Sequence, residues 1–182
     1  MLIRQSKSFG LNAYYLPVFV AGLVAMAPAL AHADPAKDLQ VAGRALTFLE
    51  NGPSGRAVLG VVFDPSKPAS VAEKNAVLAA LGGGYSAGAV TLVGKPVEVS
   101  EVGGVSGVNA LYVTSGVNYG AVGGEAKARK LVTIGSPACA QSGGCVMGVT
   151  TEPKVEITVN RSTAAAVGAS FKAAFRMMIK EI

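Results

Sequence analysis

Histidine and tryptophan are almost missing from this sequence of 182 residues, which has one histidine and no tryptophan. The single histidine, His32, lies in an N-terminal segment with the features of a removable export signal. Histidine is the usual general base near neutral pH and the commonest metal ligand, so a chain without it is poorly equipped for histidine-dependent hydrolysis, phosphorelay or zinc chemistry. We therefore expect a protein that is not an enzyme and that has no cofactor and no metal site.

Cysteine is also scarce, since Cys139 and Cys145 are the only two. In an oxidising compartment a close pair of this kind is more often a disulfide than a metal site, and the chain offers no second ligand pair. A bond that closes so short a loop should stabilise the fold by roughly 2 kcal/mol on the chain-entropy model. Two reduced, buried thiols are the alternative.

Charged residues make up only 15% of the chain, and the formal net charge is +5. The predicted export signal contains two of the 16 basic residues and none of the 11 acidic ones, so the mature chain keeps 14 basic residues and a net charge of +3. This excess is too small and too scattered along the sequence to indicate nucleic-acid binding.

Long hydrophobic runs are confined to the N-terminus, although hydrophobic residues form 51% of the chain. Arg4 and Lys7 form a short basic start, residues 16–30 are apolar apart from two prolines, and residues 31–33 read Ala-His-Ala, the small-residue pattern of a cleavage site. A retained membrane anchor is the alternative, but a spanning helix needs roughly 20 apolar residues. We predict that residues 1–33 are a cleaved signal, so that the protein works in the periplasm without a permanent membrane anchor.

Residues 34–182 have the length of one ordinary domain. Apolar residues spaced by three and four predict helices, and short apolar runs predict strands. The predicted helices cover residues 37–50, 70–81 and 117–130, and the predicted strands cover residues 57–63, 89–93, 110–114 and 131–134. This alternation indicates an α/β fold, a single compact domain with a mostly parallel sheet and helices on both faces. Residues 96–105 are compatible with a short edge strand or with a loop.

The C-terminal part predicts a β-hairpin followed by one closing helix. Two strands over residues 145–150 and 154–160 are joined by a short turn that contains Pro153. Asn160 or Ser162 can cap the helix that follows. One side of this helix would carry the apolar stripe Val167, Phe171, Phe175, Met178 and Ile182.

The same predicted helix places three basic residues four apart, at Lys172, Arg176 and Lys180. They would form a basic ridge opposite the apolar stripe. Such a ridge is either a solvated face or a contact for an acidic partner or for anionic lipid head groups.

Residues 84–88 match the G-x-S-x-G pattern, in which Ser86 would be a nucleophile. That pattern requires a serine on a sharp turn from a strand into a helix, with a histidine to deprotonate it. Here the predicted order is helix, turn and strand, and the histidine is missing. The pattern therefore indicates a flexible glycine connection, with hydrolysis at Ser86 as an alternative for testing.

Polar residues follow three of the predicted strands. Asp64 to Ser66 come after the first strand, Ser115 after the strand over 110–114, and Ser136 after the strand over 131–134. Parallel α/β sheets bind ligands at the carboxyl ends of their strands, so these residues are candidate ligand-binding walls. They support a single-lobe periplasmic small-solute binding protein as one hypothesis.

A second hypothesis comes from a resemblance. Residues 130–182 resemble the C-terminal half of the YfiR-like (HmsC-like) periplasmic family, in which an "LTVG" strand, a glycine-containing loop, a strand ending in Asn and an alanine-rich helix follow one another. The residues that match in order are 131–135, 143–144, 155–160 and 164–171, and upstream residues 94–99 and 110–115 look like two further strands of the family. The Cys139 and Cys145 pair looks like the disulfide found in the same loop of the family.

This resemblance implies a non-enzymatic periplasmic regulator. Members of the family bind an inner-membrane diguanylate cyclase and hold it inactive in cyclic-di-GMP signalling and biofilm control, with redox state and dimerisation as control points. The chain departs from the family where an aromatic "F-V-x-W-P" segment is usual, because residues 48–53 contain no tryptophan. Phe48 and Leu49 are the candidate partner contacts in that segment, beside the basic ridge. This regulator is our first hypothesis, and the solute binder is the alternative.

Overall fold

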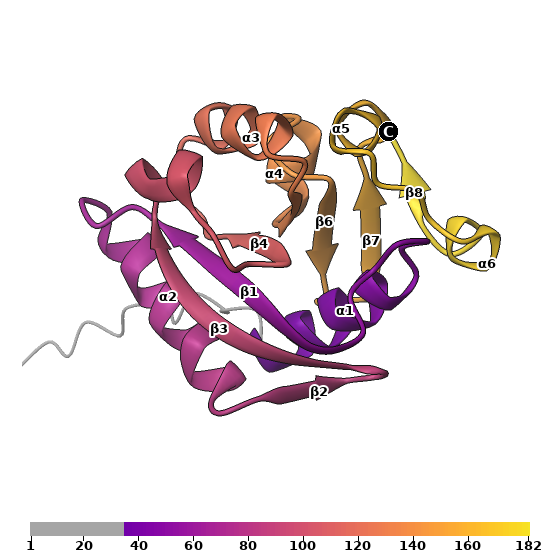
Figure 1. The fold of residues 1–182 in the computed structure, drawn as a ribbon, viewed down its shortest axis with the longest axis horizontal. Helices are drawn as coiled ribbons and strands as arrows, with labels where there is room; N and C mark the ends of the chain where they lie inside the picture. The colour runs from indigo at the N-terminus through magenta and orange to yellow at the C-terminus, as the bar shows by residue number, and fades with distance from the viewer. Residues whose placement is uncertain (1–34) are drawn as a thin grey trace, which may run out of the picture. The chain divides into compact units, whose positions relative to one another are not determined.

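A central sheet of eight strands organises the computed structural model, which describes residues 35–182 (Figure 1). The predicted signal over residues 1–33 lies outside the described residues. The strands lie side by side in the order β2-β3-β1-β4-β5-β6-β7-β8. Their bounds are β1 Gly55–Phe63, β2 Tyr85–Ala87, β3 Val90–Glu98, β4 Ala110–Val113, β5 Val132–Gly135, β6 Met147–Thr150, β7 Glu156–Val159 and β8 Lys180–Glu181.

The centre of the sheet is parallel, as the sequence predicts. Strands β3, β1, β4, β5 and β6 run in one direction, and β1 pairs with β3 over its whole length, from Gly55↔Val90 to Phe63↔Glu98. Antiparallel pairing joins β2 to β3 and β6 to β7. The β6–β7 pair is the predicted C-terminal hairpin. The mostly parallel sheet, with helices between its strands, confirms the predicted α/β class.

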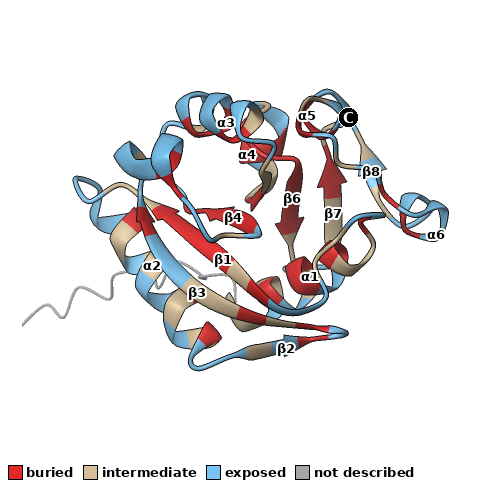
Figure 2. Cartoon of the chain, in the orientation of Figure 1, coloured by how far each residue is buried: buried red, intermediate tan, exposed pale blue. Residues whose placement is uncertain are grey.

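Helices cover both faces of this sheet. The helical segments are α1 Pro35–Thr47, α2 Pro68–Leu81, the 3₁₀ helix η1 Val99–Gly104, α3 Tyr119–Ala128, α4 Pro137–Gln141, α5 Arg161–Val167 and α6 Ala173–Arg176. One buried cluster contains residues of α1 and α2, and a second contains residues of η1, α3 and α4 (Figures 1 and 2). Successive residues of a strand point to opposite faces, so Val61 of β1 belongs to the first cluster and Val62 to the second.

Local sequence signals explain where several helices start. Asn118 caps α3 by accepting a hydrogen bond from the backbone of Ala121, and Asn160 caps α5 in the same way through Thr163. Ser136 caps α4 through the N–H of Cys139. Each of these side chains satisfies a backbone donor that the first turn of a helix leaves without a partner. Among the described residues, no helix is long and apolar enough to cross a membrane.

The predicted closing helix is wrong beyond residue 167. Gly168 adopts a left-handed conformation (φ 74°) that ends α5, and the chain continues through the one-turn helix α6 into β8. Phe171 and Phe175 are buried as the stripe predicted, but Met178 is 63% exposed and Ile182 is 39% exposed. The break allows Phe171 to pair with Leu49 in an antiparallel bridge, a contact between residues far apart in the sequence.

Residues 96–105 form neither the short edge strand nor the simple loop that the sequence left open. Residues 96–98 extend β3, which is therefore a strand inside the sheet, and Val99–Gly104 form η1. The edge strands β2 and β8 were not expected as elements, and they contain only three and two residues.

Candidate functional site

The strand order reverses between β1 and β4. From β1 the chain crosses to β3 on one side, and from β3 it returns to β4 on the other side of β1. In open α/β sheets, ligands bind outside the carboxyl ends of the strands at the point where the order reverses. We call the residues that follow β1, β4 and β5 at this end of the sheet the carboxyl edge.

The predicted ligand-binding residues lie on this edge. Asp64 and Ser66 follow β1, Ser115 follows β4, and Ser136 follows β5. These strands are neighbours and run parallel, so the structure brings the three loops to one end of the sheet. Whether they bind a ligand stays a prediction.

The first loop of the carboxyl edge is an Asx turn. The carboxylate oxygen Oδ1 of Asp64 accepts hydrogen bonds from the N–H of Ser66 (2.9 Å) and from its hydroxyl (2.7 Å). These bonds, helped by the nearby charge of Lys67, hold the pKa of Asp64 below its ordinary value. The carboxylate is therefore ionised throughout the neutral range and gives this edge a fixed negative charge.

A second carboxylate, Glu73 of α2, joins the edge and was missed by sequence reasoning. Its Oε2 accepts a hydrogen bond from the backbone N–H of Ser115 (2.8 Å), and its Oε1 accepts one from the Tyr112 hydroxyl (3.3 Å). Burial, followed by the charge of Glu73, raises the pKa of Tyr112 well above its ordinary value near 10. No local pattern could reveal Glu73, because its partners are 39 and 42 residues further along the chain.

Beneath these carboxylates, buried hydroxyls connect β1, α2 and β4. The N–H of Asp64 donates to the Ser70 hydroxyl (3.0 Å), and the Thr114 hydroxyl donates to the carbonyl of Val62 (2.9 Å). Ser70 and Thr114 are both fully buried. Buried polar groups that are fully satisfied rigidify the structure around them, so the carboxyl edge rests on a preorganised base.

Ser136 caps helix α4 and also lies on the carboxyl edge. Its hydroxyl oxygen accepts a hydrogen bond from the N–H of Cys139 (3.3 Å) and lies 3.4 Å from the hydroxyl of Tyr119. It is half-buried. The carboxyl edge thus presents carboxylates, hydroxyls and Lys67, which is a set suited to recognition by hydrogen bonds and charge.

The described residues also bear on the question of a metal site and on the G-x-S-x-G serine. Over residues 35–182, no group of three or more His, Cys, Asp or Glu side chains is placed to hold a metal ion. Ser86 lies exposed on the edge strand β2, which follows helix α2. That order is the reverse of the strand-to-helix turn that the nucleophile pattern requires.

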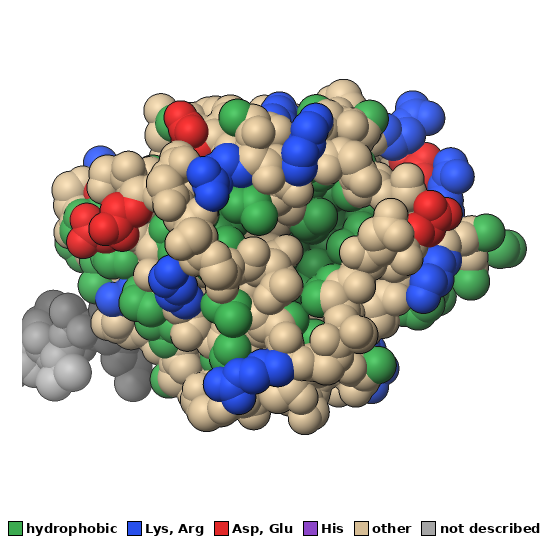
Figure 3. Space-filling view, viewed as in Figure 1, with side chains coloured by type: hydrophobic (Ala, Val, Ile, Leu, Met, Phe, Trp, Pro, Cys, Tyr) green, Lys and Arg blue, Asp and Glu red, His purple; other side chains and the backbone are tan. Residues whose placement is uncertain are grey.

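The predicted basic ridge is not present on one helix face. Lys172 precedes α6, Arg176 ends it and Lys180 belongs to β8. Lys172 donates a hydrogen bond to the carbonyl of Thr47 (3.2 Å), and Arg176 donates one to Glu181 (3.2 Å). Basic side chains are scattered over the face shown in Figure 3 and do not gather into one patch.

Phe48 and Leu49 mainly contact the protein's own C-terminal segment. Phe48 is half-buried and stacks on Phe175 with ring centroids 5.0 Å apart. Leu49 is only 7% exposed and pairs with Phe171. Leu49 therefore has little surface left for a partner, whereas Phe48 keeps some.

The predicted disulfide is confirmed. Cys139 of α4 is bonded to Cys145, which precedes β6, and both residues are 0% exposed. The bond ties α4 to the start of the hairpin. Because neither residue is accessible, a reductant reaches this bond only after the surrounding part of the fold opens.

No protein-family model matches this chain, and no curated protein matches it either. Solved structures match its fold. They include the ABC domain in complex with L-Trp from Streptococcus pneumoniae (TM-score 0.57, 12% identity, covering 82% of this chain and 60% of that one). A conserved domain protein from Vibrio cholerae matches with a TM-score of 0.55 and 12% identity, covering 82% and 60%.

A third similar structure is the ligand-free, open form of a substrate-binding protein with adhesive properties from Clostridium difficile (TM-score 0.50, 16% identity, covering 80% and 58%). The chain spans 58–60% of the length of these three proteins. At such low identity the likeness establishes the fold alone, and it agrees with the single α/β domain described above.

Proposed function

We propose that this chain is a non-catalytic binding protein that holds a small solute at the carboxyl edge. The observation that carries the proposal is the reversal of strand order between β1 and β4, with the Asp64 and Glu73 carboxylates and the loop of Ser115 gathered beside it. Sites of this kind use a few well-placed polar groups on a rigid scaffold. The buried Ser70–Thr114 contact supplies that rigidity.

Two of the similar structures support this proposal. One contains L-Trp and the other is described as a substrate-binding protein. Because the chain spans 58–60% of their length, we propose that it supplies a single binding lobe. Export to the periplasm, as the N-terminal sequence predicts, would place such a lobe where small solutes are captured.

A thermal-shift screen against amino acids, sugars and small metabolites tests this function. A solute present at 100 times its Kd should raise the Tm by roughly 5–10 °C, because it stabilises the folded state by about 2.7 kcal/mol. Asp64→Asn and Ser115→Ala should reduce the shift, whereas Ser86→Ala on the exposed strand β2 should leave it unchanged. A screen in which no class of compound raises the Tm would contradict the proposal.

A second proposal is the YfiR-like regulator. The disulfide between Cys139 and Cys145, followed by the β6–β7 hairpin, supports the proposal, because the resemblance implies a disulfide in the loop that precedes these strands. In this case the chain would act as a periplasmic repressor of an inner-membrane diguanylate cyclase, with a homodimer as a control point. Phe48, Lys172, Arg176 and Lys180 would be the candidate contacts.

A membrane pull-down with the tagged chain separates the two proposals. The regulator should recover a membrane protein with a cyclase domain, and Lys180→Glu, at an exposed position, should weaken that recovery. Lys154→Glu, an exposed lysine outside the candidate contacts, is the matched control. Recovery of no membrane protein, with or without reductant, would count against the regulator.

A further inference from the structure

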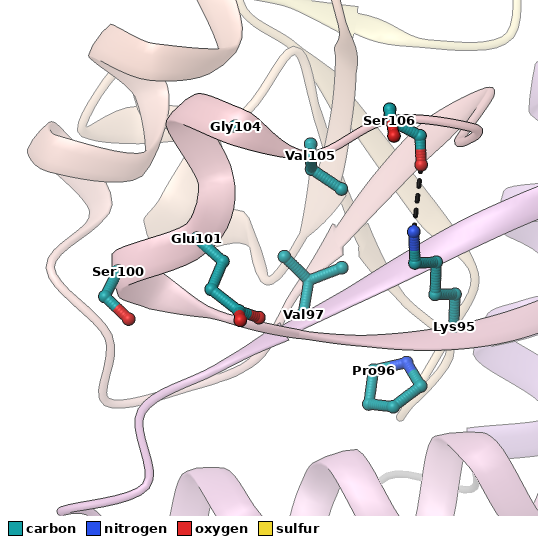
Figure 4. Close-up of a pocket in the computed structure, with 8 residues that line it drawn as sticks. All are labelled: Lys95, Pro96, Val97, Ser100, Glu101, Gly104, Val105 and Ser106. Atoms are coloured by element: carbon teal, nitrogen blue, oxygen red, sulfur yellow. Dashed lines mark hydrogen bonds between the residues drawn. The ribbon is translucent and has the colours of Figure 1, made fainter.

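A cavity of about 480 Å³ lies between β3, η1 and the segment that leads to β4, and none of the carboxyl edge residues discussed above lines it (Figure 4). It exists because the connection from β3 to β4 contains only the six-residue η1 and a loop. A full crossover helix would cover this part of the sheet, as α2 covers the opposite face. Its volume falls within the range of about 300–1,000 Å³ that is usual for small-ligand sites.

The walls of the cavity are held in place by hydrogen bonds. Lys95 Nζ donates a hydrogen bond to the carbonyl of Ser106 (2.9 Å), as Figure 4 shows. This bond joins β3 to the segment before β4 at one side of the cavity. Arg129 of the α3 C-terminus donates to the carbonyls of Gly103 and Val105 from outside. Glu101 accepts a hydrogen bond from the N–H of Glu98 (3.3 Å) and fixes the start of η1. The cavity is therefore formed before any ligand arrives.

Opposite charges lie at the two ends of this cavity. Figure 4 shows Lys95 at one end and Glu101 at the other, with the apolar side chains of Val97 and Val105 between them. Within residues 35–182, neither Lys95 nor Glu101 takes part in an ion pair. The hydroxyls of Ser100 and Ser106 line the same space. Val97 and Val105 are almost fully buried and provide an apolar floor.

We infer that this cavity binds a small zwitterion of the amino-acid class, with the ligand carboxylate toward Lys95, the ligand ammonium toward Glu101 and an apolar side chain against Val97 and Val105. Charge-assisted hydrogen bonds at both ends would select a molecule that carries both groups. The inference goes beyond the proposed function, because it adds a site whose lining includes none of Asp64, Ser66, Ser115 and Ser136 and names the ligand class for that site.

The test is an NMR titration of the full chain with free L-amino acids that have apolar side chains, starting with L-valine. Backbone resonances of residues 95–106 should shift. N-acetyl-L-valine, which lacks the ammonium group, and L-valinamide, which lacks the carboxylate, should each bind about tenfold more weakly or worse. Resonances of residues 64–66 and 115 report on the carboxyl edge in the same spectra.

Two matched variants test the charges without removing the walls. Glu101→Gln keeps an oxygen that can accept from the N–H of Glu98 but loses the charge, and it should weaken L-valine binding by about tenfold. Lys95→Met should weaken it similarly, whereas Lys95→Arg, which keeps the charge, should stay close to the parent chain. Undiminished binding in Glu101→Gln and Lys95→Met would overturn the inference.

The remaining outcomes separate this inference from the proposed function. If amino acids leave residues 95–106 unshifted while another solute shifts residues 64–66 and 115, the cavity inference fails and solute binding stands. If no solute of any class shifts either region, both proposals fail. If amino acids bind only through residues 95–106, the inference is supported and the carboxyl edge is not the site.

Discussion

The hydroxyl oxygens of Ser70 and Thr114 lie 2.6 Å apart, and both side chains are completely buried. Because Thr114 donates its proton to the carbonyl of Val62, Ser70 is the donor in this pair, and it accepts in turn from the N–H of Asp64. This directional chain joins β1, α2 and β4 at the reversal of strand order. The packing of the candidate ligand edge therefore depends on two side chains that no ligand would touch.

Ser70→Ala should lower the free energy of unfolding by about 1–3 kcal/mol, because it leaves the backbone N–H of Asp64 without its acceptor in a partly buried position. Thr114→Val should cost a similar amount by leaving the Ser70 hydroxyl without its acceptor. Urea unfolding monitored by circular dichroism measures both. The loss of unfolding free energy in the double variant should be smaller than the sum of the losses in the two single variants, because both single variants remove the same Ser70–Thr114 contact. Additive effects would show that the two hydroxyls act independently.

Gly123 and Gly124 of α3 should respond in opposite ways to substitution by alanine. A Cβ on Gly123 would lie 2.7 Å from the Cα of Gly144 and 3.1 Å from the carbonyl oxygen of Gly143, whereas a Cβ on Gly124 would meet nothing within 4 Å. Gly123→Ala should therefore destabilise the fold by about 1–3 kcal/mol through overpacking. Gly124→Ala should stabilise it by about 0.5–1 kcal/mol, because alanine loses less backbone entropy in a helix. Equal Tm values for the two variants would contradict the close packing of α3 on the disulfide loop.

The disulfide should behave as a structural bond that resists reduction in the folded protein. Both sulfur-bearing residues are 0% exposed, so dithiothreitol should reduce the folded chain far more slowly than the chain in urea, as measured by thiol labelling. The Cys139→Ala/Cys145→Ala double variant should lose about 2 kcal/mol of stability on the chain-entropy model. Fast reduction under native conditions would instead favour the redox control that the family resemblance implies.

Stability should fall in alkaline solution because of Tyr112. Its pKa is raised in the folded protein, so the unfolded chain loses this proton first, and the stabilising contribution is complete below the ordinary value near 10. Above that value the free energy of unfolding should decrease by about 1.4 kcal/mol for each pH unit until the folded-state pKa is reached. Urea unfolding at pH 9, 10 and 11 tests this, and Tyr112→Phe should flatten the dependence. An unchanged slope in that variant would assign the effect to other groups.

Tyrosine absorbance gives an independent check on the same residue. Because the pKa of Tyr112 is raised, its hydroxyl should stay protonated near pH 10 in the folded chain and should not contribute to the absorbance change there. A spectrum in which Tyr112→Phe removes part of the absorbance change near pH 10 would contradict the burial of this hydroxyl.

Local patterns in the sequence were sufficient for much of the fold. Apolar residues spaced by three and four predict a helix over residues 37–50, and the structure has α1 over Pro35–Thr47 with Leu39, Ala42 and Leu46 buried. The short apolar run over residues 57–63 predicts a strand, and these residues belong to β1, which is covered on both faces. These predictions succeed because periodicity and burial are linked within a single element.

Elements that depend on distant contacts were not predictable in this way. Strands β2 and β8 are too short to show an alternating pattern, and they form because a neighbouring strand offers its edge. The predicted closing helix failed because Gly168 ends it and because Phe171 pairs with Leu49 instead of continuing the helical turn. Local propensity favoured a helix, but tertiary packing determined the path of the chain.

The candidate sites show the same contrast between what local sequence patterns determine and what distant contacts determine. Sequence alone determined the alternation of strands and helices, the disulfide partners and the strands after which Asp64, Ser66, Ser115 and Ser136 lie. Tertiary structure alone decided the strand order, the contact of Glu73 with Ser115 and Tyr112, and the meeting of Lys95 and Glu101 across one cavity. The physical reason is that hydrogen-bonding period and side-chain spacing act over a few residues, whereas the free energy of burial selects which distant segments pack together.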